Sequence, residues 1–208
     1  MSKFRSIHFV IAAVILLGGL TIYGLLSSSQ IFHTQSLSSG KYSTSSSAES
    51  ITFATSSEPI QPKRLLIPKL NVDTDIEPVG IDVNGNMSAP VNWRNVSWYE
   101  PGFAPGEKGN AVFAGHLDWA GNTAVFWELD KLSAGDLIQI NGDTGSLRYV
   151  VVLVEEIDYQ LTDTASIFGP AASSQIKLIT CDGNFISGDG TYEKRLVVTA
   201  RLIASPDG

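Results

Sequence analysis

Residues 177–183 have the sequence KLITCDG, and the rest of the chain is interpreted outward from them. Apolar, β-prone residues run directly into Cys181, the only cysteine of the chain, and Gly- and Asp-rich residues follow. This pattern predicts a strand that ends at Cys181 and a loop after it, so that the sulfur lies at the rim of a sheet within reach of a substrate. A solitary cysteine is more often a small core hydrophobe than a nucleophile, so partners are needed to decide.

Around this stretch the chain is a series of short β-branched runs separated by turn residues. Helical patterns are scarce, with single turns expected at 125–129 and 162–168. Many short strands at nearly even spacing predict an all-β fold, a closed or nearly closed antiparallel barrel. The expected strands are 64–67, 75–79, 111–114, 136–140, 147–157, 175–181 and 195–203.

The first part of the chain has a different character. Lys3 and Arg5 precede the segment 7–26, which contains no Asp, Glu, Lys or Arg. As a helix it would span about 30 Å, the thickness of a hydrocarbon core. We expect residues 1–26 to be a cytoplasmic tip and an uncleaved transmembrane anchor, because the positive-inside rule leaves the N-terminus in the cytoplasm.

Residues 27–62 are rich in Ser and Thr and nearly free of charge, which predicts a flexible linker. The globular domain is then expected at 63–208, outside the cell membrane. A cleaved signal peptide is the competing interpretation of the first segment, but small residues of the A-x-A kind do not follow it.

Composition excludes several classes of function. The chain of 208 residues has a net charge of −7, and its Lys and Arg residues form no stripe, so we expect no nucleic-acid partner. One cysteine cannot form an intrachain disulfide. Beyond residue 60 there is one His and one Cys, whereas zinc sites use several such ligands. We therefore expect no metal and no cofactor.

Three residues form the candidate catalytic site. Cys181 and His116 each follow an apolar run, and Arg195 opens the last predicted strand. If the last two strands pair antiparallel, Cys181 and Arg195 reach the same rim of the barrel, and the position of His116 is compatible with that rim. A thiolate is a strong acyl-transfer nucleophile, a histidine moves protons, and an arginine stabilises an oxyanion.

Each residue also has an ordinary explanation. His116 also fits a structural histidine whose hydrogen bonds are satisfied within the fold. Arg195 also fits a surface residue paired with Glu193, and Cys181 also fits a buried, inert thiol. The three together weaken these explanations, because all of them fall at predicted strand ends.

At this point the residues resemble the sortases, the cysteine transpeptidases of Gram-positive cell surfaces. The marks are Leu178-Ile179-Thr180-Cys181, Ala114-Gly115-His116 and Tyr192-Glu193-Lys194-Arg195-Leu196-Val197-Val198, and the resemblance covers about residues 63–203. The extended Ala-Gly-His region and the short loops look most like class F or the related class E. Many sortases have Thr at the position of Lys177, a residue that we expect to face away from the site.

The resemblance implies an eight-stranded β-barrel with one or two short helices. It implies that Cys181 attacks the Thr–Gly carbonyl of a Leu-Pro-x-Thr-Gly-like sorting signal on a secreted protein, and that a cell-wall precursor amine resolves the thioacyl-enzyme. His116 would act as acid and base, and Arg195 would steady the oxyanion. The hydroxyl of Thr180 is expected to assist substrate binding. The rival functions are a thiol protease-like hydrolase and a non-catalytic wall-binding barrel.

Overall fold

The structure, a computed structural model, describes residues 51–158, 160, 163–188 and 190–204. The predicted transmembrane anchor lies outside the described residues, as does the predicted linker up to residue 50. None of the helices within the described ranges has the length and hydropathy needed to cross a membrane.

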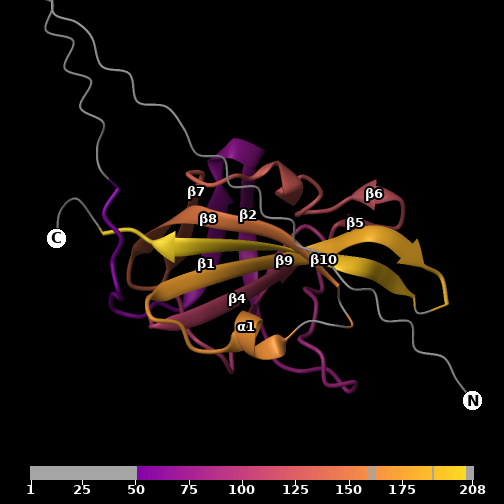
Figure 1. The fold of residues 1–208 in the computed structure, drawn as a ribbon, viewed down its shortest axis with the longest axis horizontal. Coiled ribbons are helices and arrows are strands. Elements are labelled where there is room, and N and C mark those ends of the chain that lie inside the picture. Colours follow the sequence, from indigo (N-terminus) through magenta and orange to yellow (C-terminus); the bar gives the residue numbers. More distant parts are fainter. Residues whose placement is uncertain (1–50, 159, 161–162, 189, 205–208) are drawn as a thin grey trace, which may run out of the picture. The chain divides into compact units, whose positions relative to one another are not determined.

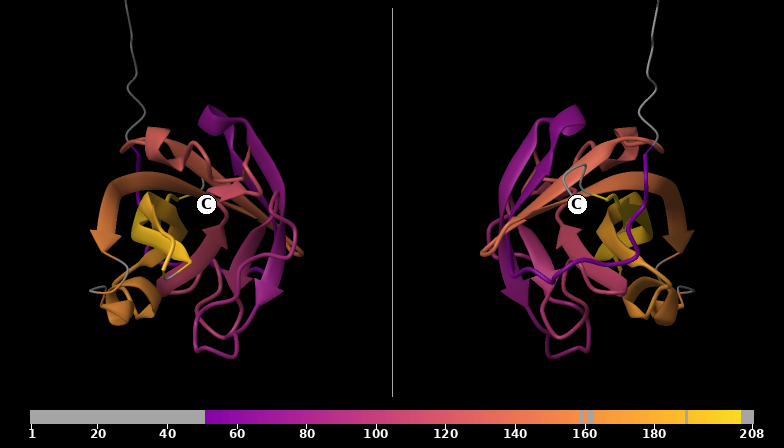
Figure 2. Two further views of the ribbon diagram at one scale, coloured as in Figure 1. Left: turned by 90° about the vertical axis from the view of Figure 1, so that its right-hand side faces the viewer. Right: turned by 90° about the vertical axis from the view of Figure 1, so that its left-hand side faces the viewer.

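Eight strands close into a barrel in the described part of the chain, in the order β1-β2-β3-β4-β9-β10-β8-β7. Figure 1 shows the barrel from the side, and Figure 2 shows the strands surrounding its interior from both ends. The predicted closed eight-stranded barrel is therefore confirmed. Its strands are β1 (Pro62–Ile67), β2 (Val72–Val79), β3 (Val96–Tyr99), β4 (Gly109–Gly115), β7 (Leu137–Gly142), β8 (Ser146–Asp158), β9 (Ser174–Ile186) and β10 (Thr191–Leu202).

Short elements lie outside the barrel. A hairpin of β5 (Asp118–Trp119) and β6 (Asn122–Thr123) follows β4, and the helix α1 (Thr164–Phe168) connects β8 to β9. Two 3₁₀ turns in the described residues, η1 (Pro68–Leu70) and η2 (Leu129–Lys131), complete the elements. Asp163 caps α1, since its side chain accepts a hydrogen bond from the amide of Ala165.

Strand directions correct one expectation. The barrel is mixed, because β2 pairs with β3 and β4 pairs with β9 in parallel, while the other neighbouring strands are antiparallel. A parallel pair needs a crossover connection, and the long segments before β3 and between β4 and β9 provide it. The sequence did not predict β3, since four residues form a run too short to distinguish from the loop around it.

A second correction concerns the ends of β9 and β10. The strands continue past Cys181 to Ile186 and begin at Thr191, so Cys181 and Arg195 lie inside a long ladder instead of at strand ends. Gly183 has a φ of +77°, and the pairing register shifts between Tyr192 and Lys194. This bulge lets the ladder run through a Gly- and Asp-rich sequence that otherwise indicates a loop.

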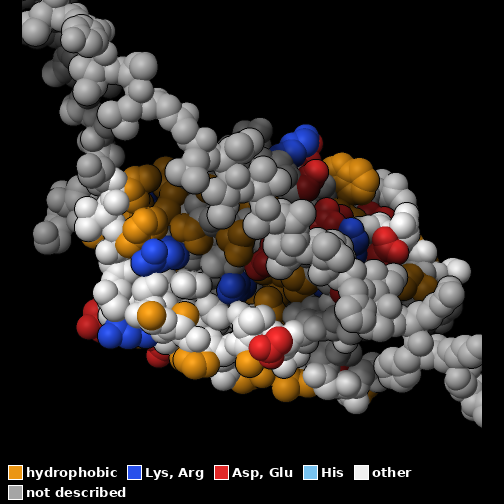
Figure 3. Space-filling view, viewed as in Figure 1, with side chains coloured by type: hydrophobic (Ala, Val, Ile, Leu, Met, Phe, Trp, Pro, Cys, Tyr) orange, Lys and Arg blue, Asp and Glu red, His pale blue; other side chains and the backbone are white. Residues whose placement is uncertain are grey.

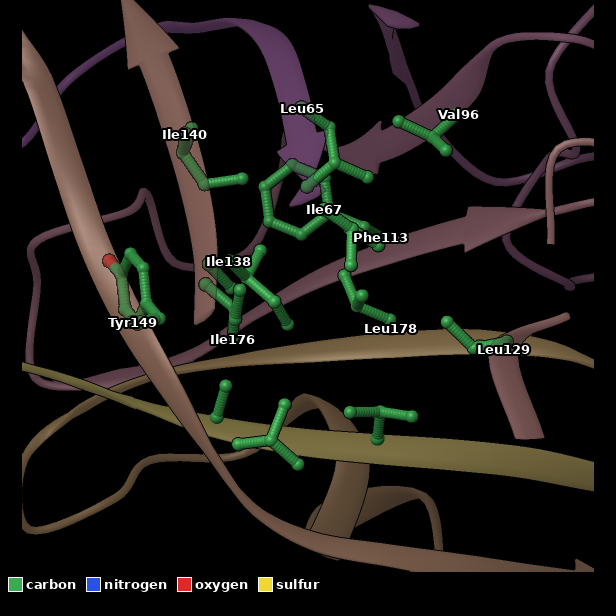
Figure 4. Close-up of a cluster of buried hydrophobic side chains, with 14 of the residues drawn as sticks. Leu65, Ile67, Val96, Phe113, Leu129, Ile138, Ile140, Tyr149, Ile176 and Leu178 are labelled. Carbon is green, nitrogen blue, oxygen red and sulfur yellow. The ribbon is translucent and has the colours of Figure 1, made fainter. Parts of the chain in front are cut away.

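The core fills the barrel interior with one face of each strand (Figure 4). Each fully buried large aliphatic side chain contributes about 1.5–3 kcal/mol through the loss of exposed apolar surface. The phenol of Tyr149 is buried among them, and its oxygen accepts the amide N–H of Gly106 at 3.0 Å. The side chains drawn and labelled are Leu65, Ile67, Val96, Phe113, Leu129, Ile138, Ile140, Tyr149, Ile176 and Leu178.

A smaller apolar cluster lies on the outer face of β4, β9 and β10. Val112 and Val197 are buried there against Ile167 of α1. Apolar side chains remain at the surface around α1, along the lower edge of Figure 3. The outer face of these three strands is therefore partly covered by α1, and the candidate active site lies on the same face.

Residues 51–61, assigned to the linker from sequence, lie against the barrel where the structure describes them. Ile60 is 5% exposed and belongs to the core. The amide of Ala54 donates to the carbonyl of Leu202 at 3.0 Å, and that of Ser57 to Gly106 at 2.9 Å. The compact unit therefore extends upstream of the predicted boundary at Lys63.

Candidate active site

Strand alternation decides where the Cys181 side chain lies. Leu178 belongs to the barrel core, whereas Ile179 packs with the outer cluster. Because successive side chains of a strand point to opposite faces, Cys181 shares the outer face with Ile179. Its thiol is partly exposed and forms no disulfide. The outer face thus presents the sulfur to the surface, as a nucleophile requires.

Arg195 lies directly opposite Cys181 in the antiparallel ladder between β9 and β10. Its guanidinium is held by three hydrogen bonds to its own strand: Nη1 donates to the carbonyls of Tyr192 at 3.0 Å and Lys194 at 2.8 Å, and Nη2 donates to Thr191 Oγ1 at 2.9 Å. The bulge after Tyr192 makes these acceptors available. The cation is therefore fixed beside the sulfur, as the sequence predicts from the pairing of these two strands.

His116 follows the last residue of β4. β4 runs parallel to β9 with Ala114 opposite Ile179, and continuing this register by two residues places His116 beside Cys181. Cys181 therefore has Arg195 opposite it on β10 and, on its other side, the end of β4 that leads into His116, which Thr180 holds through its hydrogen bond to the carbonyl of Gly115. The structure therefore brings together the three residues that the sequence predicts.

The imidazole of His116 has two defined neighbours. Nε2 lies 3.3 Å from the carbonyl oxygen of Pro90, and the ring centroid lies 5.1 Å from that of Trp119. A carbonyl only accepts, so Nε2 carries the hydrogen and Nδ1 of the neutral ring is the atom free to take a proton. Within the described residues, the ring is thus oriented by a backbone carbonyl and not by a carboxylate.

Glu77 of β2 fixes the loop that carries Pro90. Its carboxylate accepts the amide N–H groups of Val91 at 2.8 Å and Asn92 at 3.3 Å, and the side-chain amide of Asn95 at 2.8 Å. Burial acts to raise the pKa of Glu77, but these hydrogen bonds outweigh it and leave the pKa below its ordinary value. Sequence reasoning missed this residue, since nothing in the sequence connects it to His116.

The protonation of Cys181 is set by opposing influences. Burial raises the pKa of the thiol above its ordinary value, the positive charge of Arg195 lowers it, and the negative charge of Asp118 raises it further. Because the net direction is upward, the resting sulfur is chiefly a neutral thiol at pH 7. Attack on an acyl carbon therefore needs a base to take the proton, a task for which His116 is placed.

Thr180 has a structural position. Its side chain is 3% exposed, and its hydroxyl donates to the carbonyl of Gly115 at 2.9 Å. By alternation it faces the opposite side of the sheet from Cys181. This geometry argues against the substrate-binding role expected from sequence. Thr180 instead ties β9 to the end of β4, one residue before both Cys181 and His116.

Lys177 also differs from its expectation. Alternation places it on the same outer face as Cys181, where it is buried and its Nζ donates to Thr199 Oγ1 at 2.8 Å. Burial lowers the pKa of this lysine. It lies four residues along β9 from the sulfur, about 13 Å, and therefore belongs to the packing under α1 and not to the reacting centre.

A groove on the outer face leads toward the candidate residues. Its volume is about 540 Å³, and it ends at Thr191 and Arg195. Ala114 and Ile179 form its floor. Its other lining side chains come from α1, from β8 and from the loop before β3, and they are Asn86, Met87, Ile157, Thr164, Ile167 and Phe168. The groove is lined mainly by apolar side chains, with polar groups from Asn86, Thr164, Thr191 and Arg195 among them.

One interaction beside the sulfur was missed in the sequence. The hydroxyl of Tyr192 donates to Asp118 Oδ2 at 2.7 Å, which joins the β9–β10 hairpin to the β5–β6 hairpin. Only their positions in the sequence could have indicated these two residues, since Asp118 comes two residues after His116 and Tyr192 three residues before Arg195.

Within the described residues no group of three or more His, Cys, Asp or Glu side chains is arranged to hold a metal ion.

A protein-family comparison matches residues 65–203 to the sortase domain. A comparison with curated protein sequences found no match.

Solved structures also resemble the chain. A sortase D5 transpeptidase of Clostridium perfringens is 27% identical, with a TM-score of 0.53 over 69% of this chain and 79% of that one. Sortase C1 of Streptococcus agalactiae, in complex with MTSET, is 25% identical, with a TM-score of 0.55 over 69% of each chain. A lid mutant of Corynebacterium diphtheriae sortase A is 21% identical, with a TM-score of 0.55 over 73% of this chain and 75% of that one, and shows the shared fold.

Proposed function

Since the chain belongs to the sortase family of cysteine transpeptidases, which anchor proteins to the cell wall, we propose that Cys181, His116 and Arg195 carry out its acyl transfer. The observation that supports this assignment is the ladder position of Cys181, opposite Arg195 and beside His116 at the end of an apolar groove. The assignment to class F or class E stays a prediction, because the solved structures named above belong to classes A, C and D.

In the proposed first step, Nδ1 of His116 takes the proton of the Cys181 thiol. The thiolate attacks the Thr carbonyl of a Leu-Pro-x-Thr-Gly-like signal, forming a C–S bond and a negative oxygen. Arg195 stabilises that oxygen, because its guanidinium stays charged and is already fixed beside the sulfur. His116 then returns the proton to the departing Gly amine as the C–N bond breaks, which leaves a thioester on Cys181.

In the second step an amine of a cell-wall precursor attacks the thioester. A C–N bond to the acyl carbon forms as His116 accepts a proton from the amine, the C–S bond breaks, and His116 returns the proton to the Cys181 thiolate. The groove between α1 and the loop before β3 suits the Leu-Pro part of the signal, since most of its lining side chains are aliphatic or aromatic. The proposed substrates are therefore secreted proteins that carry such a signal.

The proposed place of action is the outer face of a cell membrane. It rests on the apolar segment 7–26 and on the basic residues that precede it. The domain would then meet its secreted substrates and the wall precursor on the same side of the membrane.

Mass spectrometry of the full chain with a Leu-Pro-x-Thr-Gly peptide tests this function. We expect a thioester adduct on Cys181 that disappears when a primary amine is added, with formation of the peptide–amine product. Cys181→Ala must give no adduct. Cleavage that is independent of added amine would favour the thiol hydrolase, and the absence of any adduct on the wild-type chain would favour the wall-binding barrel.

A further inference from the structure

Asp118 and Tyr192 have no part in the transfer described above, yet they lie beside the sulfur. They are 74 positions apart and share a hydrogen bond of 2.7 Å. The hairpins that carry them project at the same end of the barrel, at the right of Figure 1. This bond joins the β5–β6 hairpin to the β9–β10 hairpin. Within the described residues, no strand pairing joins these two hairpins to each other.

The Asp118 end of the bond is connected to His116 through the β5–β6 hairpin. The hairpin that carries Asp118 starts two residues after His116. It is closed by hydrogen bonds from the amide of Ala124 to the carbonyl of Leu117 at 3.0 Å and from the amide of Phe126 to the carbonyl of His116 at 3.0 Å. The next residue, Trp119, packs its ring against the imidazole. A shift of this hairpin would therefore move the imidazole.

The Tyr192 end of the bond is connected to Arg195 through the backbone of Tyr192. The backbone carbonyl of Tyr192 accepts a hydrogen bond from Arg195 Nη1 at 3.0 Å. The Tyr192 ring also packs edge-on against Phe185, with 5.4 Å between ring centroids. Tyr192 thus holds the guanidinium through its backbone and Asp118 through its side chain.

From these contacts we propose that the Tyr192–Asp118 hydrogen bond is a latch that keeps His116 and Arg195 aligned across Cys181. Both are positioning residues in this proposal, which rests on the proposed function. Neither Asp118 nor Tyr192 lines the substrate groove.

The charges around Cys181 allow the bond to be tested separately from the charge of Asp118. The thiol is faced by Arg195 and Tyr192 from β10, by Asp118 from β5 and by His116 after β4. The hydrogen bond to Asp118 raises the pKa of Tyr192 to about 12, so the phenol remains a donor at neutral pH. Asp118 therefore provides both an acceptor for the latch and a negative charge near the sulfur.

Tyr192→Phe in the full chain removes only the hydroxyl and keeps the ring against Phe185. We expect kcat of amine-dependent transfer to fall about 10- to 100-fold, because a small misplacement of catalytic groups has effects of this size. KM for the sorting peptide should change less than about twofold, since the groove is intact. Asp118→Ala should behave alike, and the double variant should be no slower than either single variant, because both lose the same bond.

Asp118→Asn is the matched variant, because the amide oxygen still accepts the Tyr192 hydroxyl while the charge is gone. We expect kcat within about threefold of wild type. The pH midpoint of iodoacetamide alkylation at Cys181 should move downward, since a negative charge that opposes the thiolate is removed. Asp130→Asn, an exposed carboxylate on η2, should change neither quantity.

The outcomes separate the latch from the function on which it rests. If wild-type protein forms the thioester and Tyr192→Phe transfers at the wild-type kcat, the latch is overturned and the proposed function stands. Additive losses in the double variant would also overturn the latch. If wild-type protein forms no thioester, the proposed function itself fails.

Discussion

Side-chain alternation along β9 assigns each residue of the 177–181 stretch its task. Leu178 and Thr180 point into the barrel, where one fills the core and the other bonds to Gly115. Lys177, Ile179 and Cys181 point outward: Lys177 is buried, Ile179 lies on the floor of the groove, and Cys181 is the proposed nucleophile. A single inserted residue would exchange these two sets, so the stretch tolerates no change in register.

Arg195→Lys tests the guanidinium. An ammonium has three donors without the planar fork, and it cannot hold Thr191, Tyr192 and Lys194 while also facing an oxyanion. We expect kcat/KM for transfer to fall about 100-fold, the size of effect seen when an oxyanion donor is lost. Arg148→Lys, at an exposed position of β8, should retain wild-type kinetics. Near-normal turnover of Arg195→Lys would remove Arg195 from this role.

Gly115→Ala tests the close approach behind His116. A Cβ at Gly115 would lie 2.5 Å from Phe126 Cδ2 and 2.8 Å from Val125 Cγ1, so the methyl group cannot enter without moving the core. We expect a loss of about 1–3 kcal/mol of unfolding free energy, measured by urea denaturation, with a fall in activity as His116 shifts. Gly145→Ala meets no atom within 4 Å and serves as the control. Equal stability of the two variants would contradict this packing argument.

Among the elements, the barrel strands were predictable where β-branched runs were long. The runs 147–157 and 195–203 correspond to β8 and β10, and the antiparallel pairing of β9 with β10 brings Cys181 to Arg195 as expected. The β5–β6 hairpin was not predictable, because two-residue strands leave no periodicity.

The remaining parts of the site depend on contacts between distant residues. Glu77 reaches the loop at 91–95, and Tyr192 reaches Asp118 across 74 positions. Local sequence shows a carboxylate or a phenol at these positions but not its partner. The three candidate catalytic residues were therefore predictable from their residue types and positions. The residues that hold them in place were not, because their partners come close only when the barrel closes.

Glu77→Gln tests how the loop before β3 is held. The pKa of Glu77 in the folded protein lies below the ordinary value of 4.5. The ionised carboxylate therefore contributes its full stabilisation above pH 4.5, and this contribution is lost as the pH falls through the pKa of the folded protein. We expect the variant to lose about 1 kcal/mol at pH 7, and we expect the difference from wild type to become smaller at a pH below the folded pKa of Glu77. Thermal unfolding at both pH values measures this. Glu100→Gln, at an exposed position, is the control, and a difference that is equal at both pH values would refute the account.

For the molecule as a whole, the question is where the folded unit begins. Residues 51–61 are polar enough to predict a flexible linker, yet they are bound to the barrel by backbone hydrogen bonds. Besides the bonds of Ala54 and Ser57, the carbonyl of Thr55 accepts the amide of Ser174 at 2.7 Å, and the amide of Ile60 donates to Pro105 at 3.1 Å. These bonds hold the start of β9, which carries Cys181, and the turn before β4, the strand that His116 follows.

Two fragments test the importance of this segment. We expect residues 51–208 to unfold at a higher urea concentration than residues 63–208, because the shorter fragment loses Ile60 from the core and leaves the amide of Ser174 without its acceptor. Within the longer fragment, Ile60→Ala should lower the unfolding free energy by about 2–5 kcal/mol, whereas Ile51→Ala, at a side chain 53% exposed, should have little effect. The loss in the shorter fragment should be at least as large as that of Ile60→Ala, since it includes the backbone bonds as well. Equal urea midpoints for the two fragments would mean that the barrel is complete from Lys63, and that the segment only rests on its surface.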